Sequence, residues 1–180
     1  MMVTRRGILA AGTVAATLPA RKLRAQESGR LKVLSAPAKP PEVAFRTPDG
    51  APRRLSDYRG QGLVVNLWAT WCAPCVAELP SLAALAKTVA ADNIAVLPIS
   101  SDHGGAAAVK AFYKTHALTG LPVLLDPEGA LMHAFAAPGI PATYVIDLAG
   151  VERGRAEGAM DWSMAAIVEL VRRLTGTVHA

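Results

Sequence analysis

The sequence is poor in cysteine: its 180 residues contain two, at positions 72 and 75. It has no second cysteine pair and no His-x3–5-His spacing, so the other half of a tetrahedral zinc site is missing. It also lacks a basic stripe with interleaved aromatic residues, and therefore gives no support for a nucleic-acid-binding surface. These absences leave the two cysteines as the main chemical feature of the chain.

The apolar run near the N-terminus is too short to cross a bilayer comfortably, because residues 7–20 number 14 and include two glycines and a proline. A basic start precedes it, and the sequence at 4–9, Thr-Arg-Arg-Gly-Ile-Leu, resembles the twin-arginine export signature. We therefore expect residues 1–25 to be an export signal that places the protein in the periplasm. Cleavage after Ala20 or Ala25 and retention as a membrane anchor are both open, and a disordered basic tail is the alternative.

Charge in the rest of the chain is balanced. Residues 1–25 contain five basic residues and no acidic one, which leaves 14 basic and 14 acidic side chains for the remainder. The formal net charge of +5 therefore belongs to the N-terminal segment. An apolar content of 52% with 18% charged residues is typical of a globular protein, and the chain is long enough for one domain with a substantial core.

One stretch, residues 62–80, combines a buried strand with the start of a helix. The run at 63–67 is largely apolar on both faces, which favours a strand in the middle of a covered parallel sheet. The Cys-x-x-Cys spacing places Cys72 at the helix N-terminus and Cys75 one turn inside. Because free N–H groups and the helix dipole favour a thiolate at that end, Cys72 is the candidate nucleophile and Cys75 the resolving thiol of a disulfide exchange.

Three other interpretations of the cysteine pair compete with this one. A structural disulfide is disfavoured because closing so small a loop removes little chain entropy. A zinc half-site lacks its remaining ligands, as noted above. The third alternative is a pair of bystander thiols without a role.

The rest of the chain alternates strands and helices. Residues 26–41 are predicted to be an extended linker, because prolines at 37, 40 and 41 prevent a long helix. Pro98 predicts a bulge or an early end in its strand, and Asp161 is a candidate cap for the last helix. The β–α alternation predicts an α/β fold with a parallel core and an antiparallel edge. The predicted elements are a hairpin of strands 43–45 and 53–55, a helix near 72–91, a strand at 94–100, a helix at 106–116, a strand at 123–125, a helix at 131–135, strands at 143–146 and 151–156, and a helix ending near 175.

Trp-Cys-Ala-Pro-Cys at 71–75, after Val-Val-Asn-Leu-Trp-Ala-Thr, resembles the thioredoxin superfamily. The leader, the acid of Glu-Leu-Pro at 78–80 and an extra β–α segment around 94–125 are similar to the TlpA/ResA/CcmG branch of exported thioredoxin-like reductases. The resemblance covers roughly residues 42–176, which we expect to form one domain. It implies a thioredoxin-like fold with a mixed central sheet flanked by helices, an N-terminal β-hairpin and an internal β–α insertion.

The resemblance also implies roles for residues around the cysteines. Pro141, in Gly-Ile-Pro-Ala-Thr at 139–143, matches a cis-proline that faces the disulfide and leaves the Ile140 backbone to pair with a substrate strand. From its position directly before Cys72, Trp71 is expected to shield the disulfide and offer a flat surface to a partner, and plain core packing is the alternative. Pro74 is compatible with a first helical turn.

Glu78 is the remaining candidate residue of the site. Thioredoxin carries a buried acid at the position of Asn66, whereas this sequence has a neutral residue there and an acid at Glu78. Relatives of the ResA kind carry an acid at the matching place, which implies that Glu78 raises the pKa of the inner thiol and handles its proton. The alternative is an ordinary acid that the helix dipole favours in an early turn.

The resemblance predicts an enzyme, a periplasmic thiol–disulfide oxidoreductase that reduces disulfides of exported client proteins, of the kind needed for apocytochrome c or copper-site maturation. It implies a membrane electron donor of the DsbD/CcdA type, no cofactor, no metal and a monomer. An oxidising or isomerising catalyst on the same fold is the main alternative. A peroxidase of the peroxiredoxin type would need a Pro-x3-Thr-x2-Cys motif that is missing, and a Sco-like copper-delivery protein would space its cysteines by three.

Overall fold

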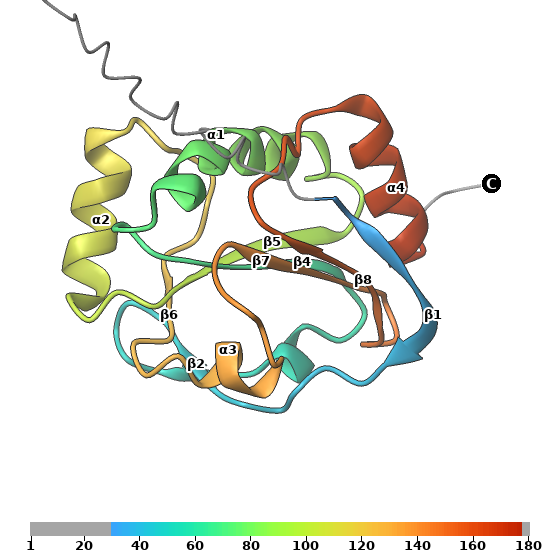
Figure 1. Cartoon of the computed structure of the whole chain (residues 1–180), viewed down its shortest axis with the longest axis horizontal. Helices are drawn as coiled ribbons and strands as arrows, with labels where there is room; N and C mark the ends of the chain where they lie inside the picture. The colour runs from blue at the N-terminus through green and yellow to red at the C-terminus, as the bar shows by residue number, and fades with distance from the viewer. Residues whose placement is uncertain (1–29, 178–180) are drawn as a thin grey trace, which may run out of the picture.

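The computed structural model describes residues 30–177, so the expected export signal at 1–25 lies outside the described residues. This part of the chain forms one mixed sheet with helices on both faces (Figure 1). In chain order its elements are β1 (Lys32–Ala38), β2 (Phe45–Arg46), β3 (Pro52–Arg53), the 3-10 turn η1 (Leu55–Tyr58), β4 (Gly62–Trp68), α1 (Ala73–Thr88), β5 (Ile94–Ser100), α2 (Gly105–Thr115), β6 (Leu124–Leu125), α3 (Ala130–Ala134), β7 (Ala142–Ile146), β8 (Glu152–Glu157) and α4 (Ala165–Thr175).

The sheet has the strand order β1-β8-β7-β4-β5-β6-β2-β3. Its centre, β4-β5-β6, is parallel, whereas β7, β8 and β1 continue antiparallel on one side and the β2–β3 hairpin continues antiparallel on the other. Every residue of β4 is buried, as expected for a strand covered on both faces. The predicted parallel core, antiparallel edge and N-terminal hairpin are confirmed.

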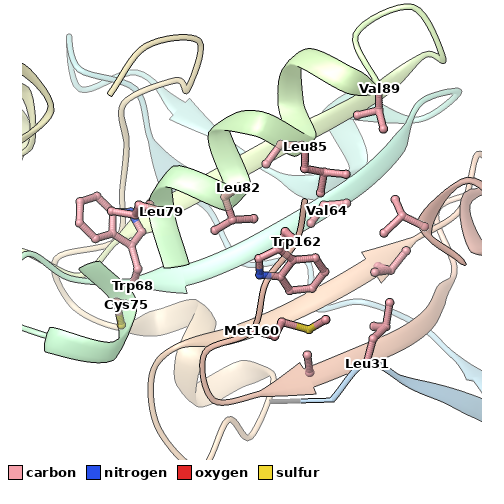
Figure 2. Packing of buried hydrophobic residues seen from close by; sticks show 14 of the residues in the cluster. Leu31, Val64, Trp68, Cys75, Leu79, Leu82, Leu85, Val89, Met160 and Trp162 are labelled. Carbon is pink, nitrogen blue, oxygen red and sulfur yellow. The ribbon is translucent and has the colours of Figure 1, made fainter. Parts of the chain in front are cut away.

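Alternate residues of β4 face two separate cores, because side chains of a strand point to opposite sides in turn. Val64 and Trp68 pack with α1, α2 and α4 on one face, and Figure 2 shows the leucines of α1 directed onto this strand. Leu63, Val65 and Leu67 pack with α3, η1 and the hairpin on the other face. Asn66 therefore points toward the face that α1 covers, which places a polar side chain beneath the helix that carries both cysteines.

The expected linker at 26–41 is partly wrong, because Lys32–Ala38 forms an edge strand antiparallel to β8. Pro37 is compatible with this position, since an edge strand has a neighbour on one side only. The partner strand offers Gly154 opposite Val33, where an added Cβ would lie 3.0 Å from the carbonyl oxygen of Lys32. Leu31 is buried in the core at the start of the strand and anchors it.

Two smaller expectations also differ from the structure. β5 runs unbroken through Pro98, and β6 pairs only with the two residues that follow, so Pro98 has a strand neighbour on one side only. Helix α4 begins at Ala165 with Met164 at its N-cap, because the Asp161 carboxylate accepts hydrogen bonds from Ser163 in the preceding loop instead. Within residues 30–177, none of the helices combines the length and the apolar character needed to cross a membrane.

Candidate active site

Cys72 and Cys75 form a disulfide at the N-terminus of α1, directly after the C-terminal end of β4. Cys72 is the N-cap, and its Sγ accepts a hydrogen bond from the backbone N–H of Cys75 at 3.3 Å. Cys72 is 6% exposed and Cys75 is fully buried. Cys72 is therefore the outer cysteine and Cys75 the inner one, as the sequence predicts, and the N–H of Cys75 would favour a thiolate at Cys72.

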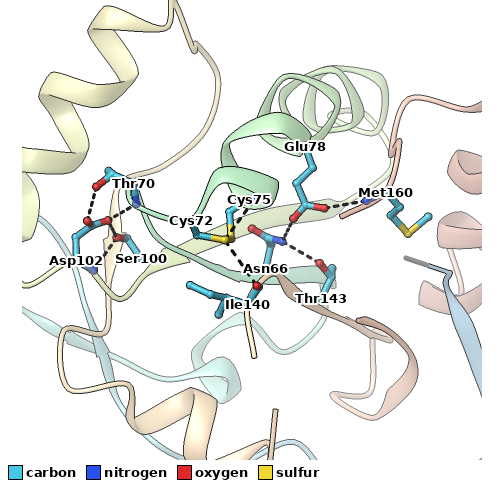
Figure 3. The surroundings of a disulfide bond; sticks show 10 residues. All are labelled: Asn66, Thr70, Cys72, Cys75, Glu78, Ser100, Asp102, Ile140, Thr143 and Met160. Atoms are coloured by element: carbon cyan, nitrogen blue, oxygen red, sulfur yellow. Dashed lines mark hydrogen bonds between the residues drawn. A yellow bond between two sulfur atoms is a disulfide. The ribbon is translucent and has the colours of Figure 1, made fainter. Parts of the chain in front are cut away.

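The loop before β7 forms the wall opposite the disulfide. The Ile140–Pro141 peptide is cis, as the resemblance implied. The carbonyl oxygen of Ile140 lies 3.6 Å from the Sγ of Cys72, and Figure 3 shows it directed at that sulfur. The structure therefore brings together, from segments nearly 70 residues apart, the outer cysteine and the backbone expected to dock a substrate strand.

Trp71 and Pro74 flank the cysteines in different ways. Trp71 is 69% exposed, which is unusual for so large an apolar side chain and leaves a flat surface beside Cys72. Pro74 is the second residue of α1, where its missing N–H would have had no partner within the helix. Trp68, by contrast, is fully buried against Phe112 and Tyr113 and belongs to the core.

Glu78 lies one turn further along α1 and is directed inward, with 3% of its surface exposed. Asn66 Nδ2 donates to Oε1 of Glu78 at 2.7 Å and also to the Thr143 hydroxyl at 2.9 Å. The backbone N–H of Met160 and the indole N–H of Trp162 both donate to Oε2, each at 3.2 Å. The carboxylate thus joins the helix, two strands and the loop before α4 in one buried network (Figure 3).

Burial raises the pKa of Glu78 from 4.5 to about 7, although the hydrogen bonds from Asn66, Met160 and Trp162 act in the opposite direction. An acid of this kind exchanges a proton close to neutral pH, which an exposed acid in an early helical turn does not. The buried network disfavours the alternative interpretation of Glu78 as an ordinary dipole-favoured surface acid.

A second polar cluster holds the loop between β4 and Cys72. Asp102 accepts hydrogen bonds from the backbone N–H of Thr70 at 2.9 Å and from the hydroxyls of Thr70 and Ser100. Asp102 is 5% exposed, so its carboxylate is a fixed anchor for the residues that precede the disulfide.

The residues expected at the site fall into two groups. The first group meets at the N-terminal end of α1, with Trp71 and Pro74 beside it, and consists of Cys72, Cys75, Ile140 and Pro141. Glu78 forms the second group with Asn66. Sequence reasoning missed Thr143, Met160, Trp162 and Asp102, because no spacing links residues that are up to 84 positions apart. Among residues 30–177 no cluster of three or more His, Cys, Asp or Glu has the arrangement of a metal site.

Residues 37–153 match the AhpC/TSA family. This chain belongs to the AhpC/TSA family. The match includes the disulfide, Glu78 and the cis-proline loop, and it excludes α4. Membership of this thioredoxin-like family confirms the resemblance that the motif at 71–75 carried.

Individual relatives agree with this assignment. The thioredoxin-like protein YneN of Bacillus subtilis is 34% identical over 113 residues, which span 62% of this chain and 65% of YneN. The thiol-disulfide oxidoreductase ResA of Geobacillus thermodenitrificans is 28% identical over 67% of this chain and 68% of ResA. The solved structure of an exposed lipoprotein thioredoxin from Streptococcus pneumoniae superposes with a TM-score of 0.62 at 31% identity, over 74% of this chain and 99% of that one.

Proposed function

We propose that the protein is a thiol–disulfide oxidoreductase that reduces disulfides of client proteins through Cys72 and Cys75. The observation that carries this proposal is the Cys72–Cys75 disulfide at the N-terminus of α1, with Cys72 outermost and its sulfur beside the carbonyl of Ile140. Relatives named thiol-disulfide oxidoreductase ResA and thiol:disulfide interchange protein DsbE support it.

The reaction proceeds in two exchanges. The Cys72 thiolate attacks one sulfur of the client disulfide, which forms a mixed disulfide and releases the other client sulfur as a thiolate. Cys75 then loses its proton, and its thiolate attacks the Sγ of Cys72, which closes the internal disulfide and releases the second client thiolate. Two electrons pass from the dithiol to the client, and the two client thiolates take up protons.

The surroundings of the disulfide suit this sequence of steps. Trp71 provides an exposed aromatic surface next to Cys72 for an unfolded or extended client. Ile140 and Pro141 provide the backbone against which the client strand lies. Pro74 lies in the first turn of α1, where the N–H that it lacks would have no partner within the helix. Glu78 receives the proton of Cys75 through the buried side of the site.

The cellular setting is part of the proposal. We place the protein in the periplasm, carried there by residues 1–25, with exported proteins such as apocytochrome c or copper-receiving proteins as clients. In that oxidising compartment the dithiol must be reduced again after each turnover. A membrane donor of the DsbD/CcdA type supplies those electrons. Names of relatives that indicate disulfide interchange and a surface lipoprotein support an exported role.

A trapping experiment tests the roles of the two cysteines. In the Cys75→Ala variant the mixed disulfide on Cys72 cannot be resolved, so client proteins should accumulate in covalent complexes that reducing agent releases and mass spectrometry identifies. The Cys72→Ala variant is the matched control, because it keeps one thiol in the same motif and should trap at least tenfold less. Equal trapping by the two variants would show that the assigned order of attack is wrong.

The direction of electron transfer, reduction or oxidation of the client, is tested separately. Equilibration of the purified protein with glutathione mixtures measures its reduction potential, and a reductant requires a potential well below that of the glutathione couple. A potential near that of strong oxidants such as DsbA would favour the alternative, an oxidising catalyst on the same fold.

A further inference from the structure

Two buried side-chain polar atoms within residues 30–177 have no hydrogen-bond partner, and one of them belongs to the site: Oδ1 of Asn66. Asn66 is fully buried, so no bulk water reaches this oxygen. An unpaired buried acceptor costs on the order of 1–3 kcal/mol. An unpaired buried oxygen in a native site therefore needs an explanation. One explanation is a hydrogen-bond donor that is present in only one redox state of the protein.

The orientation of the amide follows from its neighbours. Both hydrogens of Nδ2 are used, one on Oε1 of Glu78 and one on the Thr143 hydroxyl. Because Nδ2 donates to Glu78, the oxygen of the same amide faces away from that side chain. Figure 3 shows the amide drawn between the carboxylate and the disulfide, with its oxygen on the side of the sulfurs.

The inner sulfur lies on α1, the helix whose Glu78 accepts a hydrogen bond from the Asn66 amide. Cys75 and Glu78 are three residues apart on α1, and residues at this spacing are neighbours on one helix face. Cys75 is fully buried and has no hydrogen to donate while it is part of the disulfide. Reduction creates an S–H group on Cys75, and because this group is buried, it needs a hydrogen-bond acceptor within the protein.

We propose that Asn66 is a positioning residue that joins the inner thiol to Glu78: in the reduced protein the Cys75 S–H donates to Oδ1 of Asn66, while Nδ2 of the same amide holds Glu78. This inference rests on the proposed function, because it describes how the resolving thiol is prepared. It accounts for the unpaired acceptor, because the inner sulfur carries a hydrogen only after the disulfide is reduced.

The amide has a consequence for proton transfer. When Cys75 ionises and its proton goes to Glu78, rotation of the amide turns Nδ2 toward the thiolate and Oδ1 toward the protonated carboxyl. One proton leaves sulfur, one arrives at the carboxylate, and no electron moves. When Cys75 and Glu78 together hold one proton, the Asn66 amide can donate to the ionised group and accept from the protonated one. When they hold no proton or two, the amide can bond only one of the two groups. The titrations of Cys75 and Glu78 are therefore coupled.

Other groups around Glu78 do not replace this coupling. Met160 and Trp162 contact its second oxygen with neutral N–H donors. On α1 the titratable groups besides Glu78 are Cys75 in the first turn and Lys87 in the last turn, and Cys72 is the N-cap. Asp161 lines, with Glu78, a groove of about 620 Å³ that runs along α1 and the loop before α4, and it is exposed. Asp161 therefore faces the open groove, whereas Glu78 is 3% exposed.

The test is an NMR titration of the reduced protein with 13C labels at the cysteine Cβ and glutamate Cδ positions. Asn66→Ala removes a donor from ionised Glu78, so the Glu78 midpoint should rise by about one pH unit. The same change removes the acceptor of the Cys75 S–H, so the Cys75 midpoint should fall by a similar amount. If Asn66→Ala acted only by loosening the packing and admitting water to the site, the midpoints of both Glu78 and Cys75 would move down toward their ordinary values. A Glu78 midpoint that falls or stays constant therefore overturns the proposal.

The matched control is Thr175→Val, which also removes a buried hydroxyl hydrogen bond but lies on α4, outside the Asn66–Glu78 network. It should leave both midpoints unchanged. If Asn66→Ala does not fold, a crystal structure of the reduced wild-type protein decides: Cys75 Sγ within hydrogen-bonding distance of Oδ1 supports the proposal, and a sulfur turned to another acceptor refutes it. Reduction of a model protein disulfide by the wild type is measured in parallel, so that failure of the proposed function is seen separately.

Discussion

Replacement of Glu78 by glutamine should remove a large pH dependence of stability in the oxidised protein. The carboxyl is 3% exposed, and its pKa is raised from 4.5 to about 7. In the unfolded chain the group ionises near its ordinary value. Between these two pH values the folded state therefore binds a proton that the unfolded state has lost, and the free energy of unfolding falls as pH rises.

The magnitude follows from the size of the shift. Each pKa unit corresponds to about 1.4 kcal/mol, so the shift of Glu78 is worth about 3 kcal/mol. This stability is fully present below about pH 4.5 and is lost as the pH rises through about 7. Because the cysteines are joined in the disulfide, they do not titrate and do not contribute to the difference.

Guanidinium denaturation of the oxidised protein at pH values from 4 to 8 provides the measurement. Wild type should lose about 3 kcal/mol more than Glu78→Gln over this range, since titrations elsewhere are common to both. Glu169→Gln is the control, because Glu169 is an exposed acid on α4. If wild type and Glu78→Gln show the same pH slope, Glu78 ionises normally and its role in proton handling is refuted.

Two further changes test other parts of the site. Asp102→Ala should lower the free energy of unfolding by about 2–3 kcal/mol, because it leaves the donors of Thr70 and Ser100 without their charged acceptor. Asp102→Asn keeps an acceptor and should lose less stability in the same denaturation assay. Trp71→Ala should change stability by less than about 0.5 kcal/mol because the side chain is exposed, yet it should slow reduction of a protein disulfide more than that of a small-molecule disulfide; equal slowing would contradict a docking role.

Local sequence signals predicted the framework of the site well. The apolar run at 63–67 and the cysteine spacing placed β4 and the start of α1, because strand burial and helix capping are decided by neighbouring residues. The β-hairpin and the antiparallel β7–β8 edge also followed from turn signals. Each of these features depends on short-range patterns.

Long-range contacts account for what the sequence did not reveal. Residues 26–41 were predicted as a linker because the prolines at 37, 40 and 41 prevent a long helix, whereas pairing with the open edge of β8 makes Lys32–Ala38 a strand. Trp162 gave no signal as a partner of Glu78, since it lies in a loop 84 residues away. Asp102 was likewise invisible, because its role depends on the parallel pairing that brings the end of β5 beside the end of β4.

The placement of Glu78 is costly to stability, and this cost itself argues for a role in chemistry. A leucine at the same buried position of α1 would add to a core that already contains Leu79 and Leu82, and would avoid the desolvation of a carboxylate. Instead, three donors from β4 and the loop before α4 converge on an acid that titrates near neutral pH. Departures from local packing rules of this kind concentrate at functional sites, where stability is given up for reactivity. The network lies on the buried side of the disulfide, so under the proposed function we expect it to act on Cys75 and the resolving step. We expect the surface formed by Trp71 and Ile140 to act in the encounter with the client. Variants of the buried network should accordingly alter the pH dependence of resolution, and variants of the surface should alter client binding.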